Sequence, residues 1–127
     1  MKKILIVGGS GTIGSAFIKE FYDKYEFTSI SRNELNQAEL KRKFPKEKRL
    51  KENTVCLITL FKKIKPDVVI HMAAMKHVNL AEENPINACN VNVLGSINVI
   101  SASISTNVPM TIGISTDKAC FPENVYG

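Results

Sequence analysis

The sequence predicts an α/β fold, a doubly wound parallel sheet of about five strands, from three observations. Short apolar runs alternate with longer segments of helical periodicity, which is the pattern of βαβ units. The first run, residues 4–7, is apolar throughout, as in a strand buried on both faces of a parallel sheet. The length of 127 residues corresponds to one domain, since a domain takes roughly 100–200 residues.

The expected helices and strands follow from this alternation. Each helix carries apolar side chains three or four residues apart, and each strand is a short apolar run. Asn53 can cap one helix, while Pro45 and Pro66 follow the ends of two others. In chain order after the first strand, we expect helix 13–25, strand 27–30, helix 34–44, helix 53–64, strand 67–71, helix 85–105 and strand 109–115.

The net charge of +5 is concentrated in one segment. From Arg32 to Lys65 there are 11 Lys and Arg against 4 Asp and Glu, whereas the rest of the chain has 6 against 8. Most of the excess lies in residues 41–51, which we interpret as a solvated helix end and loop, with a basic patch for anionic ligands as the alternative. A nucleic-acid partner is therefore not expected.

Cysteine content and the length of the apolar runs argue against disulfide-rich, metal-binding and membrane-spanning proteins. The three cysteines, Cys56, Cys89 and Cys120, are odd in number and include no C-x-x-C pair. This argues against a disulfide framework or a metal site and favours a reducing cytoplasm. No apolar run comes near the roughly 20 residues that span a bilayer, so no membrane partner is expected.

A glycine-rich loop follows the first strand directly. The sequence GGSGTIG at residues 8–14 satisfies G-x-G-x-x-G from Gly9 and precedes the first amphipathic helix. In that context the loop lets a pyrophosphate approach the backbone and places its charge at the helix N-terminus. The pattern predicts an NAD(P)-binding, Rossmann-like domain over residues 1–127, with a tight turn that holds no ligand as the alternative.

The end of the second strand indicates which dinucleotide is bound. An acidic residue there would accept hydrogen bonds from a ribose 2′-hydroxyl and repel a 2′-phosphate. Here the chain reads Ser31-Arg32-Asn33, with no acid before Glu34. The planar guanidinium of Arg32 suits a phosphate, so NADP is favoured over NAD, and a solvated surface arginine is the alternative.

Six blocks of the sequence form a recognisable series: GGSGTIG at 8–14, SRNEL at 31–35, HMAAMKHV at 71–78, ENP at 83–85, NVLG at 92–95 and STDKA at 115–119. They resemble the extended short-chain dehydrogenase/reductases, and within them most closely the soluble UDP-N-acetylglucosamine 4,6-dehydratases. The resemblance covers nearly the whole chain, and the A-A-x-K-H-V and S-T-D-K-A patterns are more specific than the glycine loop. That family makes UDP-4-keto-6-deoxy sugars for surface polysaccharides and for flagellin modification.

The resemblance implies a set of binding residues for NADP and for a UDP-sugar. Met72, Thr116 and Asp117 would face the sugar nucleotide. NADP would be held by Gly8, Ser10, Gly11, Thr12, Ile13 and Gly14 in the glycine loop, by Ser31, Arg32, Asn33, Glu34, Leu35 and Asn36 after the second strand, and by Ala73, Ala74 and Lys76 beside the nicotinamide.

The resemblance also implies catalytic roles for three residues in an internal redox cycle. Hydride leaves C4 of the sugar, water is eliminated across C5 and C6, and hydride returns at C6. Tyr126 would take the C4 hydroxyl proton, Lys118 the C5 proton made acidic by the neighbouring ketone, and Asp117 would protonate the departing C6 oxygen. A surface ion pair at a strand end is the alternative for Asp117 and Lys118.

Three further polar residues are weighed as site candidates. His71 lies inside an apolar run, so we expect a packed neutral histidine rather than a catalytic base. His77 belongs to the K-H-V element and would have a positioning role at most. By resemblance Asn92 would order the active-site backbone and waters, with a plain polar helix residue as the alternative.

Two departures from the family pattern shape the expected function. Residues 48–56 stand where the family has a third strand ending in an aspartate that reads the adenine, which leaves Glu52 or Asn53 as substitutes. The sequence ends at Gly127, directly after Tyr126, whereas the family has a lysine four residues beyond the tyrosine. That cation would share a helical face with the tyrosine and favour the tyrosinate.

We therefore expect the cofactor-binding part of an NADP-dependent dehydratase, without its substrate domain and inactive by itself. The sheet would be open at one edge, which predicts a homo-oligomer. Two alternatives remain: a nucleotide-sugar 4-epimerase or reductase of the same superfamily, which a bulky hydrophobe or second serine in place of Asp117-Lys118 would favour, and a non-catalytic dinucleotide-binding or oligomerising fragment.

Overall fold

The computed structural model describes residues 1–127 except 33, 46–47 and 52–55. Its centre is a five-stranded sheet in the order β3-β2-β1-β4-β5, and all the neighbouring strands are parallel. This confirms the predicted α/β class and the doubly wound, Rossmann-like sheet. The strands are β1 (Lys3–Val7), β2 (Glu26–Ser31), β3 (Lys48–Lys51), β4 (Val68–His71) and β5 (Met110–Gly113).

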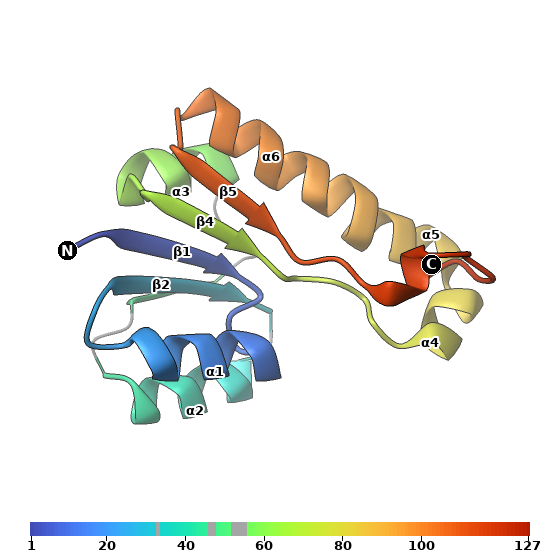
Figure 1. Ribbon diagram of the computed structural model, residues 1–127, viewed down its shortest axis with the longest axis horizontal. Coiled ribbons are helices and arrows are strands. Elements are labelled where there is room, and N and C mark those ends of the chain that lie inside the picture. The colour runs from blue at the N-terminus through green and yellow to red at the C-terminus, as the bar shows by residue number, and fades with distance from the viewer. Residues whose placement is uncertain (33, 46–47, 52–55) are drawn as a thin grey trace.

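Helices cover both faces of the sheet. The helices α1 (Thr12–Phe21) and α2 (Glu34–Lys43) lie on one face, and α3 (Leu57–Ile64) and α6 (Gly95–Ser105) lie on the other (Figure 1). The remaining helical segments extend beyond the carboxyl ends of the strands. They are α4 (Val78–Glu83), α5 (Pro85–Cys89), the π-helical turn η2 (Asn90–Leu94) and the single 3-10 turn η3 (Asp117–Ala119).

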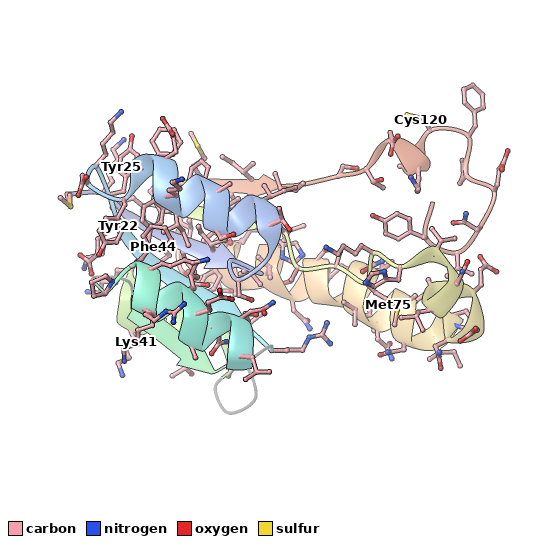
Figure 2. All side chains as sticks on the ribbon, turned by 90° about the horizontal axis from the view of Figure 1, so that it is seen from below. Tyr22, Tyr25, Lys41, Phe44, Met75 and Cys120 are labelled. Carbon is pink, nitrogen blue, oxygen red and sulfur yellow. The ribbon has the colours of Figure 1, made fainter. Side chains whose placement is uncertain are left out.

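The core is divided by the sheet into two apolar clusters, because successive strand residues point to opposite faces. Ile4 and Ile6 of β1 pack toward α1 and α2, whereas Leu5 and Val7 pack toward α3 and α6. Aromatic rings extend the first cluster at its margin, where the Tyr22 and Phe44 rings lie 5.1 Å apart between their centroids (Figure 2). Burial of β1 on both faces explains why residues 4–7 are apolar throughout.

Several element boundaries differ from the sequence predictions. The first helix ends at Phe21 instead of residue 25, and the chain continues as a turn in which the Lys24 amide bonds the Phe21 carbonyl three residues back, not four as in an α-helix. The prediction of a loop up to residue 51 is wrong for Lys48–Lys51, which pairs with β2 as an edge strand. Edge strands tolerate charged residues, so this strand has no apolar signature. Asn53, the expected helix cap, lies outside the described residues.

The long helix expected over residues 85–105 is present as three consecutive pieces, α5, η2 and α6. Its length and a mean hydropathy of 1.2 would be sufficient for a membrane span, although polar residues interrupt the apolar ones along it. Core helices of soluble proteins have the same length and composition. Here Val99 and Ala102 pack on the sheet, while Ile97, Ile100 and Ile104 of the same helix are exposed.

The strand order reverses at β1, which lies between β2 and β4. In open α/β sheets the carboxyl edge at such a reversal is where ligands bind, because the loops that follow the two strands diverge there. The glycine loop leaves β1 at this point, and the segment of residues 72–77 leaves β4 beside it (Figure 1). The sheet topology therefore brings two of the blocks singled out in the sequence to one place.

Candidate functional site

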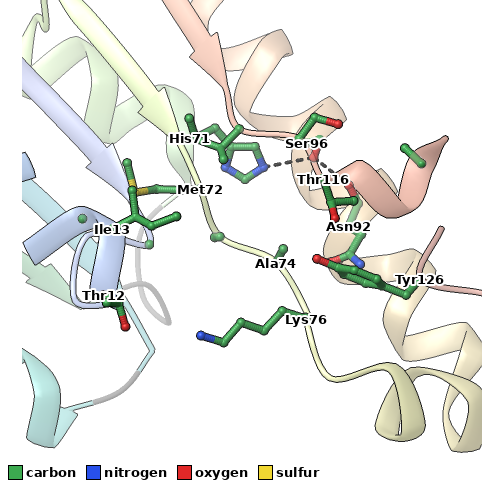
Figure 3. A pocket seen from close by; sticks show the side chains of 17 residues that line it. Thr12, Ile13, His71, Met72, Ala74, Lys76, Asn92, Ser96, Thr116 and Tyr126 are labelled. Carbon is green, nitrogen blue, oxygen red and sulfur yellow. Dashed lines mark hydrogen bonds between the residues drawn. The ribbon is translucent and has the colours of Figure 1, made fainter. Parts of the chain in front are cut away.

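A cavity of about 410 Å³ opens at this edge of the sheet (Figure 3). It is bordered by the glycine loop, by the segments that follow β4 and β5, and by the helix that contains η2 and α6. The structure therefore brings together most of the residues expected to bind cofactor and substrate. These are Gly8, Gly11, Thr12, Ile13, Gly14, Met72, Ala73, Ala74, Lys76, Thr116 and Tyr126.

The glycines of the loop differ in what excludes a side chain at each position. Gly8 has φ of +92°, and a Cβ there would lie 2.7 Å from the backbone nitrogen of Ala73. A Cβ on Gly14 would lie 2.6 Å from the Cα atom of Gly9. Gly11 instead has an ordinary φ of −76°, and a Cβ there would meet only the Gly8 carbonyl oxygen at 3.5 Å. Gly11 nevertheless borders the cavity, so its missing side chain leaves room for a ligand.

The start of α1 is suited to an anion. Within the described part of the chain, no side chain caps this helix and its first turn has no acidic residue. The first N–H groups of a helix lack intrahelical partners and carry the positive end of the helix dipole. Together with the space beside Gly11, this arrangement fits the pyrophosphate of a dinucleotide.

The end of β2 is tied to the glycine loop by polar contacts. The Ser10 and Ser31 hydroxyls hydrogen bond to each other, and the buried side chain of Gln37 donates to the Ser31 carbonyl. Arg32 follows and borders a second hollow of about 250 Å³ next to the cavity, also bordered by Ala73. Leu35 and Asn36 are exposed at the start of α2. Asn33 and the Glu34 side chain lie outside the described part.

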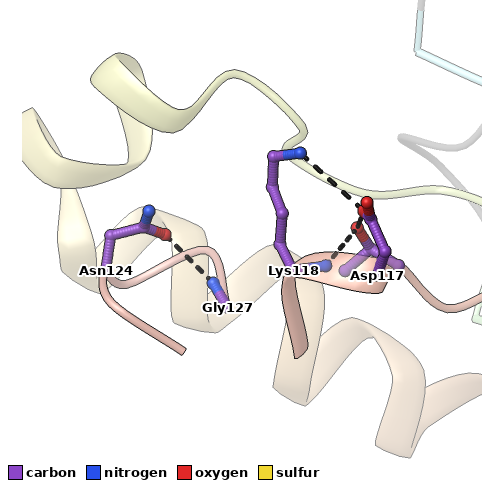
Figure 4. A network of polar contacts seen from close by, with 5 residues as sticks. Asp117, Lys118, Asn124 and Gly127 are labelled. Atoms are coloured by element: carbon purple, nitrogen blue, oxygen red, sulfur yellow. Dashed lines mark hydrogen bonds and ion pairs between the residues drawn. The ribbon is translucent and has the colours of Figure 1, made fainter. Parts of the chain in front are cut away.

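The chain after β5 folds back so that Tyr126 reaches the cavity. The Val125 amide donates to Oε1 of Glu82 in α4 at 2.6 Å, and the Tyr126 amide donates to Oδ1 of Asn124 at 3.1 Å. The Gly127 amide donates to the same Asn124 oxygen, also at 3.1 Å (Figure 4). These bonds hold the tyrosine side chain at the cavity wall beside Asn92 (Figure 3). Glu82 of α4 thus holds Val125, the residue before Tyr126, although the two lie 43 residues apart in the sequence.

Asp117 and Lys118 lie at the rim of the cavity and not in its wall. Lys118 Nζ is 3.8 Å from Asp117 Oδ1, and the aspartate side chain is 91% exposed (Figure 4). The residues on either side of the pair, Thr116 and Ala119, do border the cavity. The Lys118 amide donates to Thr116 Oγ1 at 3.3 Å, which begins the η3 turn. The roles of the pair stay predictions.

A hydrogen-bonded group on η2 and α6 forms the opposite wall. His71 Nε2 lies 3.0 Å from Ser96 Oγ, and the Asn92 side chain bonds both the amide and the carbonyl of Met75, at 2.7 and 3.1 Å. Burial lowers the pKa of His71, so its imidazole is neutral at pH 7, as predicted. Ser96 was not singled out in the sequence, although it follows Asn92 by one helical turn.

Gly11→Ala and Gly14→Ala separate ligand binding from packing. We expect Gly14→Ala to lower the free energy of unfolding by about 1–3 kcal/mol, because its methyl group would overlap the Gly9 backbone. Gly11→Ala should leave stability within about 0.5 kcal/mol and still weaken dinucleotide binding, because its methyl group would border the cavity. Urea unfolding and fluorescence titration measure the two effects. Equal binding by wild type and Gly11→Ala would contradict the pyrophosphate placement.

The half-buried His71 should make stability depend on pH. The unfolded chain takes up a proton near the ordinary histidine pKa of about 6.5, whereas burial lowers the pKa of His71 in the folded chain. The free energy of unfolding should therefore fall as the pH drops below about 6.5, until the folded protein is protonated as well. The described residues that border the same hollows include Arg32, Lys76 and Tyr126 but no Asp or Glu that would stabilise an imidazolium.

The measurement is urea unfolding of wild type and of His71→Gln at several pH values between about 5 and 7.5. Glutamine does not titrate in this range, so the variant should lose the part of the pH dependence that His71 causes. Parallel curves for the two proteins would show that another group is responsible.

Comparison with known proteins gives the family. Residues 4–127 match the family described as "Polysaccharide biosynthesis protein". The chain is 40% identical over 140 residues to "UDP-N-acetylglucosamine 4,6-dehydratase (inverting)" of Campylobacter jejuni, covering 99% of this chain and 40% of that relative. It is 36% identical to a "UDP-glucose 4-epimerase" of Rickettsia massiliae, also over 99% of this chain and 40% of the relative.

A solved structure agrees with this assignment. Pen from Bacillus thuringiensis superposes with a TM-score of 0.89 at 35% identity, over 99% of this chain and 41% of that one. The chain thus spans about 40% of the length of the proteins that it matches. The match over residues 4–127 means that the chain belongs to the polysaccharide biosynthesis protein family.

Proposed function

We propose that this chain is the cofactor-binding part of an NADP-dependent nucleotide-sugar 4,6-dehydratase that converts UDP-N-acetylglucosamine to a UDP-4-keto-6-deoxy sugar. The observation that carries the proposal is the single cavity bordered by the glycine loop at one end and by Tyr126 at the other. The 40% identity to a dehydratase of that name supports the reaction. A cytoplasmic location and a homo-oligomer stay predictions.

The dinucleotide would lie along the carboxyl edge of the sheet. Its pyrophosphate would sit at the start of α1 beside Gly11, and its nicotinamide would lie against the segment from Met72 to Lys76. When bound, the nicotinamide supplies reversible hydride transfer, taking a hydride from sugar C4 and returning it at C6. Lys76 extends its side chain into the cavity, where its charge favours an anionic ligand (Figure 3).

Tyr126 would act at C4 of the sugar. Its side chain borders the cavity beside Asn92 and Thr116. The phenol oxygen would receive the proton of the C4 hydroxyl of a sugar bound there. As a base the tyrosine takes the hydroxyl proton while the hydride leaves C4, which produces the ketone. The ketone makes the neighbouring C5 proton acidic and so prepares the elimination.

Asp117 and Lys118 would carry out the elimination as a pair. The step needs an amine that accepts the C5 proton and a carboxylic acid that gives a proton to the departing C6 oxygen. Lys118 Nζ and Asp117 Oδ1 lie 3.8 Å apart, which is beyond hydrogen-bond distance, so the two side chains would first move closer and Lys118 would then pass one proton to Asp117. After the C5 proton reaches Lys118 and water leaves with the proton from Asp117, both groups return to their charged forms. Atoms and charges therefore balance without another acid or base.

An epimerase is the second candidate. The Rickettsia massiliae relative, named a UDP-glucose 4-epimerase, is 36% identical to this chain. Epimerisation needs the dinucleotide and a base at C4 but no acid at C6, so the Asp117-Lys118 pair would have no chemical role in it. Product analysis distinguishes the two reactions, because only the dehydratase releases a 4-keto-6-deoxy sugar.

Arg32→Ala tests the cofactor. We expect wild type to bind NADP more tightly than NAD, and Arg32→Ala to lose about 1.5–3 kcal/mol of NADP binding with little change for NAD. The variant Arg42→Ala, at the exposed end of α2, is the matched control for a lost charge away from the hollow. Both cofactors are titrated against the three proteins. Equal wild-type affinities, or equal losses for both cofactors in Arg32→Ala, would exclude the preference.

Asp117→Asn and Lys118→Ala test the elimination in the complete protein. Each should reduce release of the 4-keto-6-deoxy product by about 100-fold or more while leaving NADP affinity nearly unchanged. Glu123→Gln removes an exposed carboxylate in the same segment and should keep wild-type turnover. A substituted enzyme that formed product at the wild-type rate would make the pair a surface ion pair without a catalytic role.

A further inference from the structure

His71 occupies a position that three hollows share. It is the last residue of β4, where it pairs with Val7 of β1 on one side and Gly113 of β5 on the other. Its side chain borders the main cavity, the hollow beside Arg32, and a third hollow of about 550 Å³ next to β5. The imidazole is thus a common wall at the centre of the carboxyl edge, and a change in its position would affect all three.

The hydrogen bonds around His71 define which nitrogen carries the proton. Ser96 Oγ lies 2.6 Å from the carbonyl oxygen of Asn92, which can only accept, so the serine uses its single hydrogen there. In its contact with His71 the serine must then accept, and Nε2 must be the donor, at 3.0 Å. Nδ1 is left as a bare acceptor. It is buried, and no described residue bonds it.

These bonds close a ring around the segment that follows β4. From His71 the ring runs to Ser96, from the Ser96 hydroxyl to the Asn92 carbonyl, and from the Asn92 side chain to the backbone of Met75. The covalent chain from Met75 back to His71 completes it. This chain includes Ala73 and Ala74, which border the cavity, in a segment outside any helix or strand. Hydrogen bonds to Asn92 and Ser96 of the helix therefore fix the path of residues 72–75.

The helix after the segment contributes two residues to this ring. Asn92 lies inside the π-helical turn η2, and Gly95, whose amide bonds the Asn90 carbonyl five residues back, comes directly before Ser96. Side chains four residues apart lie on one side of a helix, and both residues border the cavity. His71 is the residue on the sheet that meets Ser96 (Figure 3).

The contact between the ring and the glycine loop gives the ring a functional consequence. A Cβ added to Gly8 would lie 2.7 Å from the Ala73 nitrogen, so there is no free space between the two segments. A small displacement of residues 72–75 would therefore be transmitted to the glycine loop. The position of Ala73 matters for the place where a pyrophosphate is bound.

We propose that His71 is a positioning residue: as a neutral Nε2–H imidazole it holds Ser96, and through Ser96 and Asn92 it fixes residues 72–75 against the glycine loop in the geometry that binds the dinucleotide. The ligand in this inference rests on the proposed function. The ring itself does not, because its hydrogen bonds are present without a ligand.

The test uses variants that keep or remove the donor. His71→Gln keeps an amide nitrogen that can donate to Ser96, whereas His71→Leu removes it. We expect His71→Leu to weaken NADP binding by about five-fold and to speed hydrogen exchange at the Met75 amide by about ten-fold, and His71→Gln to restore both to within about two-fold of wild type. Ser96→Ala should resemble His71→Leu. The double variant that combines His71→Leu with Ser96→Ala should bind NADP no more weakly than either single variant, because both changes break the same series of hydrogen bonds.

Ser103→Ala is the matched control. Ser103 donates to the Val99 carbonyl at 2.9 Å on the same helix, the same type of bond as that of Ser96, but it does not border the cavity. The Ser103→Ala substitution should lower the free energy of unfolding without changing NADP affinity or hydrogen exchange at the Met75 amide. Spectra of ¹⁵N-labelled histidine give an independent readout, since the proposal requires a proton on Nε2 and none on Nδ1 of His71 at pH 7.

Each outcome decides the proposal. The opposite tautomer, unchanged Met75 exchange in His71→Leu, or equal losses in His71→Leu and His71→Gln would overturn it. A loss of affinity in Ser103→Ala as large as that in Ser96→Ala would also overturn it, because stability alone would then explain the effect. If wild type binds neither NADP nor NAD, the proposed function fails, whereas exchange and the histidine spectra still decide whether His71 fixes the segment.

Discussion

The site depends on one close backbone contact, between Gly8 after β1 and Ala73 after β4. The two strands are hydrogen-bonded neighbours, so the segments that leave them must pass each other within a strand spacing. Gly8 has a φ of +92° and no side chain, and both allow this close approach, because any Cβ would overlap the Ala73 backbone. The cavity exists because the chain diverges on either side of this contact, toward α1 in one direction and toward α4 in the other.

Local patterns in the sequence predict most of this fold. The apolar residues 4–7 and the glycines that follow them indicate a buried strand and a tight turn, and the structure has both there, with the turn at the border of the cavity. The basic strand Lys48–Lys51 could not be predicted in this way. It is stabilised by backbone pairing with β2, and an edge strand needs no alternation of apolar side chains. Periodicity reports burial, and it fails where backbone pairing alone forms the element.

The residues of the candidate site also divide into those that a local sequence pattern predicts and those that it does not. The residues of the glycine loop are contiguous, so their role follows from spacing alone. Tyr126 reaches the cavity through long-range geometry, because the chain folds back onto Glu82, and no local rule predicts that arrangement. Ser96 shares a helix face with Asn92, four residues before it, but only the packing of the helix beside β4 brings it to His71. Resemblance to a family identified Tyr126 because a motif records the outcome of such geometry, whereas Ser96 belongs to no motif that was recognised.

The two ends of the cavity are held by different kinds of interaction. The cofactor end rests on β1, whose residues Ile4 to Val7 are buried among both apolar clusters. The end that would bind the sugar is formed by the segment after β5, which is mostly exposed and is held by single polar bonds such as that from Val125 to Glu82. Local opening requires less free energy where few apolar contacts are lost. The segment bearing Tyr126 can therefore open at a lower cost in free energy than the glycine-loop end of the cavity.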